Sequence, residues 1–293
     1  MAVKIAVASG KGGTGKTTVA TNLAAVAAGA GRPVHLCDCD VEEPNAHLFV
    51  RPEFDERRDV TVALPVVDVG LCEHCGACAE ICAFNAIAPM PERTVIFEDL
   101  CHACGGCRLV CPNGAISDGS KRIGRLETGA ARGFRFTHGR LDIGQVRVPP
   151  LIEAVQALEK PGEFVIRDAP PGVTCPTVAA LRGADFALLV TEPTPFGLHD
   201  LAAAVELVRA LALPCGVVVN RDGAGDDRVA RYCADEGIQL LPGIPFSRDV
   251  ARAVSRGELI VDVLPEMREI FVSLLDAVTE RLDHPDTVRE VRT

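Results

Sequence analysis

Short apolar runs alternate with Ala-rich or amphipathic stretches along most of the chain. Buried strands are predicted at 3–8, 33–37, 163–167, 186–191 and 215–220. Helices are predicted at 16–28, 198–211, 227–236, 248–255 and 266–282. Because alternating strands and helices build parallel sheets covered on both faces, the fold class is predicted to be α/β, with a mostly parallel sheet and helices on both sides.

Residues 66–118 break this alternation. The segment shows little helical periodicity, contains eight of the thirteen cysteines, and carries seven Asp and Glu against two Arg, a net charge of −5. It also repeats internally, because residues 71–87 resemble residues 100–116 at an offset of 29 positions. We therefore expect an inserted domain at 66–118 and a discontinuous core formed by residues 1–65 and 119–293.

Composition narrows the possible functions. The chain is 48% hydrophobic with few aromatic residues and no Trp, so Val, Ala and Leu must fill its core. A net charge of −10 argues against general nucleic-acid binding. We see neither a signal-peptide pattern nor an apolar stretch of about 18 residues, so we expect a cytoplasmic protein without a membrane span. In that compartment thiols stay reduced, which favours metal binding over disulfides. Residues 121–148 are predicted to form hairpins or loops.

A phosphate-binding loop follows the first predicted strand and opens the first predicted helix. It consists of Gly10, Lys11, Gly12, Gly13, Thr14, Gly15, Lys16, Thr17 and Thr18. The glycines allow backbone N–H groups to surround phosphate oxygens at a helix N-terminus. Lys16 is predicted to bind the β- and γ-phosphates of ATP or ADP, and the Thr17 hydroxyl to ligate Mg²⁺. A plain glycine turn is the alternative interpretation.

Lys11 gives this loop a second lysine, and the pattern resembles the deviant Walker A loop of the MinD, ParA and nitrogenase iron protein class of ATPases. The resemblance implies a nucleotide-sandwich dimer in which Lys11 reaches the partner's nucleotide. There it would neutralise charge that develops on the transferred phosphoryl group. The alternative is a solvated loop lysine.

The resemblance extends to two further segments at the ends of predicted strands. Asp38 and Asp40, followed by Pro44 and Asn45, resemble the switch I segment. This resemblance implies that Asp40 positions the attacking water and that Asp38 supports the loop or the metal shell. Residues 168–172 resemble switch II, which implies that Asp168 holds Mg²⁺ through water and that the Gly172 N–H senses the γ-phosphate. Each of these short matches is weak evidence when taken alone, because acidic residues at strand ends are often helix caps.

Two more segments match the family's base-recognition positions. Asn220 and Arg221 end a predicted strand, and Pro245 lies between Ile244 and Phe246. The resemblance implies that Asn220 and Arg221 recognise the base and that the segment around Pro245 flanks it.

The inserted segment carries two runs of four cysteines, each spaced C-x2-C-x2-C-x3-C, in the doubled pattern of bacterial ferredoxins. Three thiolates of each run can reach one [4Fe–4S] cluster, and the fourth faces the other cluster. The predicted ligand sets are Cys72, Cys75, Cys78 and Cys111 for one cluster, and Cys101, Cys104, Cys107 and Cys82 for the other. Zinc ligation, a disulfide framework and a cluster pair that never changes its charge are the alternatives.

Five cysteines lie outside the two runs: Cys37, Cys39, Cys175, Cys215 and Cys233. Most are expected to be small buried hydrophobes. Cys175 lies seven residues after Asp168, a spacing that matches one ligand of the bridging cluster of the nitrogenase iron protein, but the chain offers no second ligand. His74 and His102, inside the cysteine runs, are expected to lie at the surface or beside the clusters rather than to ligate.

Over nearly its whole length the chain resembles MinD-superfamily ATPases with an inserted two-cluster ferredoxin domain. The resemblance implies slow, Mg²⁺-dependent and partner-coupled ATP hydrolysis, a homodimer or a heterodimer with a paralogue, and an unidentified redox partner. We therefore predict nucleotide-driven dimer closure coupled to electron transfer through two [4Fe–4S] clusters.

The main alternative function is an iron–sulfur carrier that delivers clusters. A spatial-positioning ATPase is a weaker alternative, because residues 284–293 mix Arg with Asp and Glu and form no apolar face. An amide-forming ligase shares the loop, but the chain has no room for a glutaminase domain.

Overall fold

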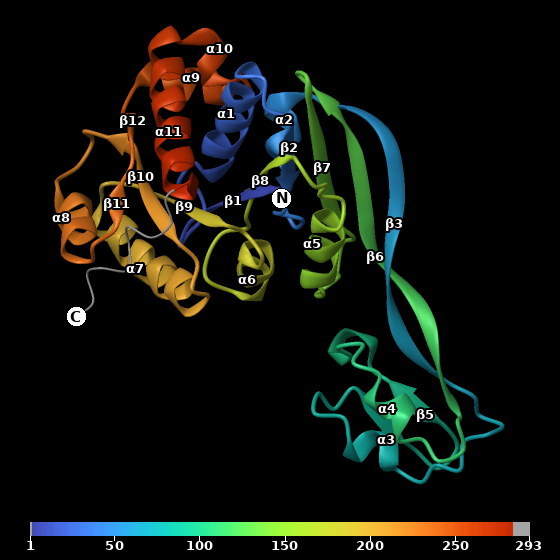
Figure 1. Cartoon of the computed structure of the whole chain (residues 1–293). Helices are drawn as coiled ribbons and strands as arrows, with labels where there is room; N and C mark the ends of the chain where they lie inside the picture. The colour runs from blue at the N-terminus through green and yellow to red at the C-terminus, as the bar shows by residue number, and fades with distance from the viewer. Residues whose placement is uncertain (1, 284–293) are drawn as a thin grey trace.

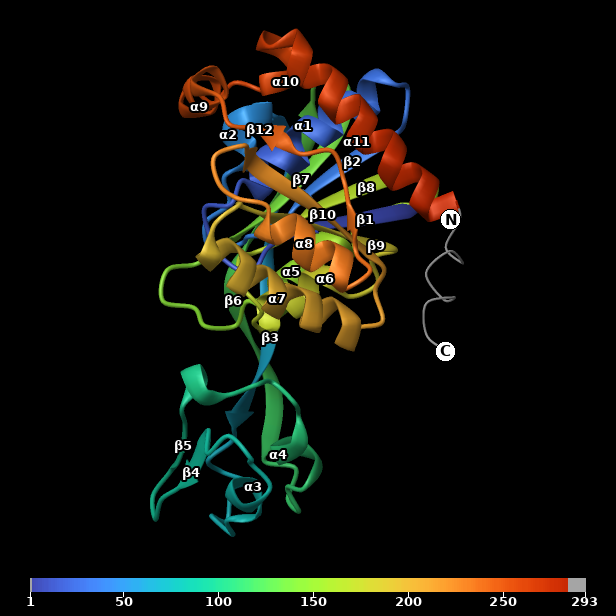
Figure 2. The ribbon, with the colours of Figure 1, turned by 90° about the vertical axis from the view of Figure 1, so that its left-hand side faces the viewer.

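The computed structural model describes residues 2–283 of the 293-residue chain. The tail on which the argument against membrane positioning depends, residues 284–293, lies outside the described residues. The described part consists of an α/β core and a smaller lobe that hangs from it on two long strands (Figures 1 and 2).

One large sheet forms the middle of the core. Its strands are β1 (Val3–Ala8), β2 (Val34–Asp38), β3 (Glu53–Val67), β6 (Ile116–Ala131), β7 (Phe134–Leu141), β8 (Phe164–Asp168), β9 (Phe186–Thr191), β10 (Cys215–Asp222), β11 (Gln239–Leu240) and β12 (Ile244–Pro245). Their order is β11-β10-β9-β1-β8-β2-β7-β6-β3, with β12 beside β10. The strands from β11 to β7 are parallel, and β6 and β3 are antiparallel to their neighbours. The predicted mostly parallel α/β sheet is confirmed.

Helices cover both faces, because the central strands are apolar on both sides. One face packs against α1 (Lys16–Gly29), α2 (Ala46–Val50), α9 (Arg248–Ser255), α10 (Ile260–Val263) and α11 (Pro265–Asp283). The other packs against α5 (Pro149–Gln156), α6 (Cys175–Leu181), α7 (Pro195–Ala210) and α8 (Arg228–Asp235). The carboxyl ends of β1, β2 and β8 lie together at one edge, where ligands bind in sheets of this kind.

The lobe comprises residues 68–115, which we call the cysteine-rich lobe. It contains α3 (Ala77–Glu80), β4 (Ile87–Pro89), β5 (Thr94–Ile96), the 3₁₀ helix η1 (Glu98–Leu100) and α4 (Gly106–Leu109). It is somewhat shorter than the predicted 66–118, because β3 and β6 remain paired as far as Val67 and Ile116. The predicted hairpins within 121–148 are β6 and β7, which are part of the core sheet.

The internal sequence repeat is also a repeat of backbone shape. Gly76 and Gly105, 29 positions apart, both have left-handed φ values (86° and 73°) and precede α3 and α4. His74 and Ala103 form a second left-handed pair, with φ values of 52° and 54°. Each half of the cysteine-rich lobe therefore folds its three closely spaced cysteines in the same tight turn.

Candidate functional site

The loop between β1 and α1 has the backbone that a phosphate site needs. Gly13 and Gly15 have φ values of 79° and 97°, which other residues rarely adopt. A Cβ at Gly10 would lie 1.9 Å from the backbone oxygen of Asp200, so this position must be glycine. Lys16, in the first turn of α1, is buried. Burial lowers its pKa, while Asp168 and Asp40 favour its charged form.

A cleft opens beside this loop and brings together residues from distant parts of the chain. Of the predicted site residues, it is lined by Gly12, Gly13, Gly15, Lys16, Thr17, Thr18, Asp40, Asn220, Arg221 and Pro245. Gly10, Lys11, Thr14, Asp168 and Gly172 do not line it. Phe49 of α2 and Val250 and Val254 of α9 form an apolar wall of the cleft that was not predicted from the sequence. Their only signal was an apolar face on short helices, which any core helix also shows.

Asp168, at the end of β8, has the character of a carboxylate that needs a cation. Its side chain is buried, and neither oxygen has a hydrogen-bond partner of normal geometry within the described residues. Burial raises its pKa to about 7, and the nearby Thr17 hydroxyl and Lys16 favour the ionised form. A buried carboxylate without partners beside a threonine hydroxyl suits Mg²⁺, so the residues present fit the predicted metal.

Asp38 shapes the loop that carries Asp40. Its carboxylate accepts hydrogen bonds from the backbone N–H groups of Asp40 (3.1 Å), Asn45 and Ala46 (both 3.0 Å), the last two at the start of α2. Burial and the nearby Asp168 raise the pKa of Asp38. Of the two roles predicted for Asp38, the contacts show support of the loop. Asp40 is half-buried at the cleft, where a water-positioning group would have to lie.

The eight cysteines of the two runs line two separate cavities in the cysteine-rich lobe. One cavity is lined by Cys72, Cys75, Cys78 and Cys111. The other is lined by Cys82, Cys101, Cys104 and Cys107. In both cavities the fourth cysteine therefore comes from the opposite run, which is the grouping that the sequence predicts. Phe84 stacks on His102 beside the second cavity, with ring centroids 3.7 Å apart.

Backbone groups already point at the sulfur atoms. The N–H of Ala86 donates to Cys82 Sγ and the N–H of Ala115 to Cys111 Sγ, both at 3.3 Å. Such bonds stabilise cluster thiolates. Burial and neighbouring cysteines raise the pKa of Cys78, so a positive centre is needed to hold this thiol ionised. Among residues 2–283, no three Cys, His, Asp or Glu converge closely enough for a single metal ion.

The remaining cysteines divide as expected. Cys37, Cys39 and Cys233 are buried, and burial raises the pKa of Cys233 to about 11. Cys215 is partly buried, and burial raises its pKa also to about 11. Such thiols are inert core residues. Cys175 differs, because it is exposed at the start of α6, directly after the predicted switch II segment.

A model of the CobQ/CobB/MinD/ParA nucleotide-binding domain matches residues 5–260. The chain belongs to this family. The protein MJ0578 of Methanocaldococcus jannaschii is 30% identical over 281 residues, which cover 95% of this chain and 97% of that protein. The iron–sulfur cluster carrier protein of Aquifex aeolicus is 25% identical over 300 residues, covering 94% of this chain and 67% of the carrier.

Among solved structures, the septum site-determining protein MinD of Pyrococcus horikoshii, complexed with Mg-ADP, aligns with a TM-score of 0.60. The identity is 22%, and the alignment covers 95% of this chain and 96% of the MinD chain, so the likeness shows the fold alone. None of the helices within residues 2–283 has the length and apolar character needed to cross a bilayer.

Gly172 and Asn220, to which the family resemblance gives nucleotide contacts, instead form hydrogen bonds within the protein. The Gly172 N–H donates to the carbonyl oxygen of Ser9 (3.0 Å), so it must leave this bond before it can contact a γ-phosphate. The Asn220 amide donates to the carbonyl oxygen of Thr14 (2.8 Å) and packs against Gly15. In this structure Asn220 therefore braces the phosphate loop, although it also lines the cleft where the base is expected.

The second lysine of the loop has an acidic neighbour that the sequence analysis missed. Lys11 Nζ lies 3.8 Å from one carboxylate oxygen of Glu192, and Arg221 Nη1 lies 2.8 Å from the other. Glu192 follows β9 directly, as Asp168 ends β8, so its place at a strand end was the available signal. A part-exposed pair of this length contributes little to stability, and Lys11 can leave it for another anion.

The buried carboxylate of Asp168 predicts a pH-dependent metal site. Because burial raises its pKa to about 7, we expect Asp168 of the free protein to lose its proton as the pH rises through neutrality. The stability that the protonated form contributes is lost over the same range, and a bound Mg²⁺ would take the place of the proton. We expect Mg²⁺-dependent nucleotide binding to tighten from about pH 6 to about pH 8, with net proton release.

Calorimetry in buffers of different ionisation enthalpy measures this proton release directly. An Asp168→Asn variant is the control, since it should bind Mg²⁺ weakly and release no proton. Proton release that persists in the variant would assign the titration to another group.

Proposed function

We propose that this protein is an iron–sulfur ATPase whose nucleotide state controls two clusters held in the cysteine-rich lobe. One observation carries the proposal: the two cavities are each lined by four cysteines, and the strands that bear them, β3 and β6, belong to the sheet that also forms the nucleotide cleft. The nucleotide cleft and the two cysteine-lined cavities thus belong to elements of one sheet, which supports the proposal.

The nucleotide half follows from the residues around the cleft. Lys16 binds the terminal phosphates, Thr17 and Asp168 hold Mg²⁺, and Asp40 orients the attacking water. Lys11 acts in a dimer, where it exchanges Glu192 for the phosphate of the facing subunit. The presence of Mg-ADP in the MinD structure of P. horikoshii supports this assignment. The dimer is a homodimer or a heterodimer with a paralogue, and hydrolysis is slow and coupled to a partner.

The cysteine half houses two [4Fe–4S] clusters in a ferredoxin-like arrangement. Cys72, Cys75, Cys78 and Cys111 hold one, and Cys82, Cys101, Cys104 and Cys107 hold the other. Such clusters, when bound, accept and release single electrons. The chain's own contribution is to fix eight thiolates, to donate N–H bonds to sulfur, and to present an acidic lobe to a redox partner. We therefore propose nucleotide-controlled electron transfer in the cytoplasm.

Cluster delivery is the second candidate, and the comparisons favour it over electron transfer. The similar protein of A. aeolicus is named an iron–sulfur cluster carrier. The shape of the cavities favours resident clusters instead. Cys82 and Cys111 tie each cavity to the opposite run, so releasing a cluster requires both runs to open.

One experiment separates these candidates. Protein purified without oxygen is reduced with dithionite, and in parallel it is incubated with an apo-ferredoxin and ATP. Electron transfer predicts about eight irons per chain, reversible bleaching of the visible absorption and no loss of iron. Delivery predicts iron transfer that depends on ATP. Protein that binds no iron under these conditions would refute both.

A further inference from the structure

Arg147 joins the core to the cysteine-rich lobe. It lies in the loop between β7 and α5, two residues before α5 begins, and the residue is only 9% exposed. Its Nε donates to the carbonyl oxygen of Cys101 (2.9 Å), and its Nη2 donates to the carbonyl oxygen of Glu98. Cys101 is the first cysteine of its run, and Glu98 opens η1 immediately before it. The guanidinium thus holds the backbone of residues 98–101, which leads into the second cavity, through two hydrogen bonds.

The two elements that this loop joins, β7 and α5, pack against Val41, the residue that follows Asp40 of the predicted switch I. Val41 follows Asp40 directly and is buried. Its carbonyl oxygen accepts a hydrogen bond from the N–H of Leu141 (2.8 Å), the last residue of β7. A Cβ at Gly139 would lie 2.7 Å from Val41 and 3.0 Å from Leu151 of α5, so these three residues are in close contact. A shift of the Asp40 segment must therefore press on β7 and α5.

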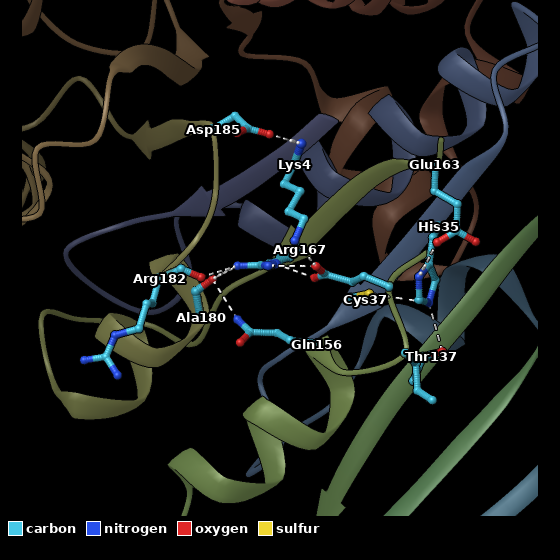
Figure 3. A network of polar contacts seen from close by, with 12 residues as sticks. Lys4, His35, Cys37, Thr137, Gln156, Glu163, Arg167, Ala180, Arg182 and Asp185 are labelled. Carbon is cyan, nitrogen blue, oxygen red and sulfur yellow. Dashed lines mark hydrogen bonds and ion pairs between the residues drawn. The ribbon is translucent and has the colours of Figure 1, made fainter. Parts of the chain in front are cut away.

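The strand that leads into the predicted switch II is joined to α6 and to the segment that follows α5 (Figure 3). Arg167 directly precedes Asp168, and its Nη1 donates to the carbonyl oxygens of Ala180 (3.0 Å) and Arg182 (2.8 Å) at the end of α6. Its other nitrogens bind both carboxylate oxygens of Glu159, just beyond α5, at 2.6 and 2.9 Å. Gln156, in the last turn of α5, donates to the carbonyl oxygens of Ala179 (2.9 Å) and Ala180 (3.2 Å). Helices α5 and α6 are therefore bound to one another and to the strand that ends in Asp168.

We propose that Arg147 is a positioning residue that carries the nucleotide state of the core to the cluster held by Cys82, Cys101, Cys104 and Cys107. The inference rests on the proposed function. Val41, beside Asp40, and Arg167, beside Asp168, each contact elements that pack on α5, and Arg147 leads into that helix. Movement of α5 shifts the guanidinium relative to Cys101 and changes both the backbone of the cluster loop and the local charge.

The positive charge of Arg147 lies beside the second cavity, where it bonds to the backbone at Cys101 and Glu98. A cation beside an anionic cluster stabilises its more negative, reduced form, and burial strengthens the effect. Among the described residues, no Arg or Lys of the core forms a hydrogen bond or ion pair with the 72–78 run. Arg147 therefore raises the reduction potential of the cluster of the Cys101 run, and this contribution changes with the bound nucleotide.

The test compares Arg147→Gln and Arg147→Lys with Arg108→Gln. Arg108 lines the same cavity but pairs with Asp118 (2.9 Å) of β6, so its removal changes the local charge without cutting the link to the loop before α5. Midpoint potentials of both clusters are measured by EPR-monitored titration with ADP or a non-hydrolysable ATP analogue. Hydrogen exchange of residues 98–104 is followed in the same samples.

We expect the wild type to show one cluster whose potential differs between the two nucleotides. Arg147→Gln should lower that potential and remove its response to nucleotide, and exchange at 98–104 should become about tenfold faster. Arg147→Lys should keep a midpoint potential close to that of the wild type, because it keeps the positive charge. It should lose the nucleotide response, because an ammonium group cannot form both hydrogen bonds to the carbonyl oxygens of Cys101 and Glu98. Arg108→Gln should keep the response.

A nucleotide response that survives in Arg147→Gln, or exchange at 98–104 that matches the wild type, would overturn the proposal. A variant that has lost iron would be judged on hydrogen exchange alone, because that measurement does not need the clusters. Failure of the proposed function can be told apart from failure of the Arg147 proposal, because it would appear in the wild type as a lack of iron or of nucleotide binding.

Discussion

Replacing Cys111 with Ala is expected to empty the cavity of the first cysteine run, although Cys111 lies in the second run. Iron should fall from about eight to about four atoms per chain. The reason is the crossed lining of the cavities, in which Cys111 joins Cys72, Cys75 and Cys78. Iron analysis and EPR of the reduced protein measure the outcome. Cys175→Ala is the control, because this exposed cysteine lies outside both cavities and its loss should leave about eight irons.

Double variants show which cysteines share a cluster. Cys111→Ala combined with Cys72→Ala should still hold about four irons, because both residues belong to one cavity. Cys111→Ala combined with Cys101→Ala should hold almost none, because it damages both cavities. The reverse pattern would mean that each run binds its own cluster, and the arrangement described above would be wrong.

Replacing Lys16 with Ala is expected to abolish ATP turnover and to weaken nucleotide binding about 100-fold. A buried lysine that contacts the terminal phosphates supplies charge-assisted hydrogen bonds worth about 3 kcal/mol, which corresponds to that factor. A fluorescent ADP derivative measures binding, and phosphate release measures turnover. Iron content should remain at the wild-type level, because the cysteine-rich lobe does not contact Lys16.

Lys11→Ala is the matched control within the same loop. Within residues 2–283, the one ion pair of Lys11 is with Glu192 at 3.8 Å, and Lys11 does not line the cleft of its own chain. Nucleotide binding should therefore be nearly unchanged while turnover falls, since the role proposed for this residue is across a dimer interface. If Lys11→Ala weakened binding as much as Lys16→Ala, the role across the dimer would be wrong. If Lys16→Ala kept wild-type binding, the cleft would not be the nucleotide site.

The fold was predictable wherever the chain has strong local periodicity. The strand at 186–191 and the helix at 248–255 occur at the predicted residues, because each is a compact apolar or amphipathic stretch with clear ends. The strands β3 and β6 were not recognised as part of the core sheet. Most residues of β3 are exposed, and β6 mixes exposed with buried positions, so neither strand has the continuous apolar run of a buried strand.

The candidate sites were predictable to the extent that their chemistry is local in sequence. The cysteine spacing specified both cavity linings, including the exchange of Cys82 and Cys111. The positions of Phe49, Glu192 and Arg147 could not be predicted in this way. Each lies beside residues that are distant in sequence, and nothing in its immediate neighbours distinguishes it from an ordinary apolar or charged residue.

The central claim is that nucleotide in the cleft changes the clusters in the cysteine-rich lobe. Its most direct test is the midpoint potential of each cluster in protein saturated with a non-hydrolysable ATP analogue and in protein saturated with ADP. Lys16→Ala serves as the variant that cannot respond. The account predicts that one cluster changes its potential between the two nucleotides in the wild type and that neither cluster changes in the variant. Equal potentials in both nucleotides in the wild type would contradict it.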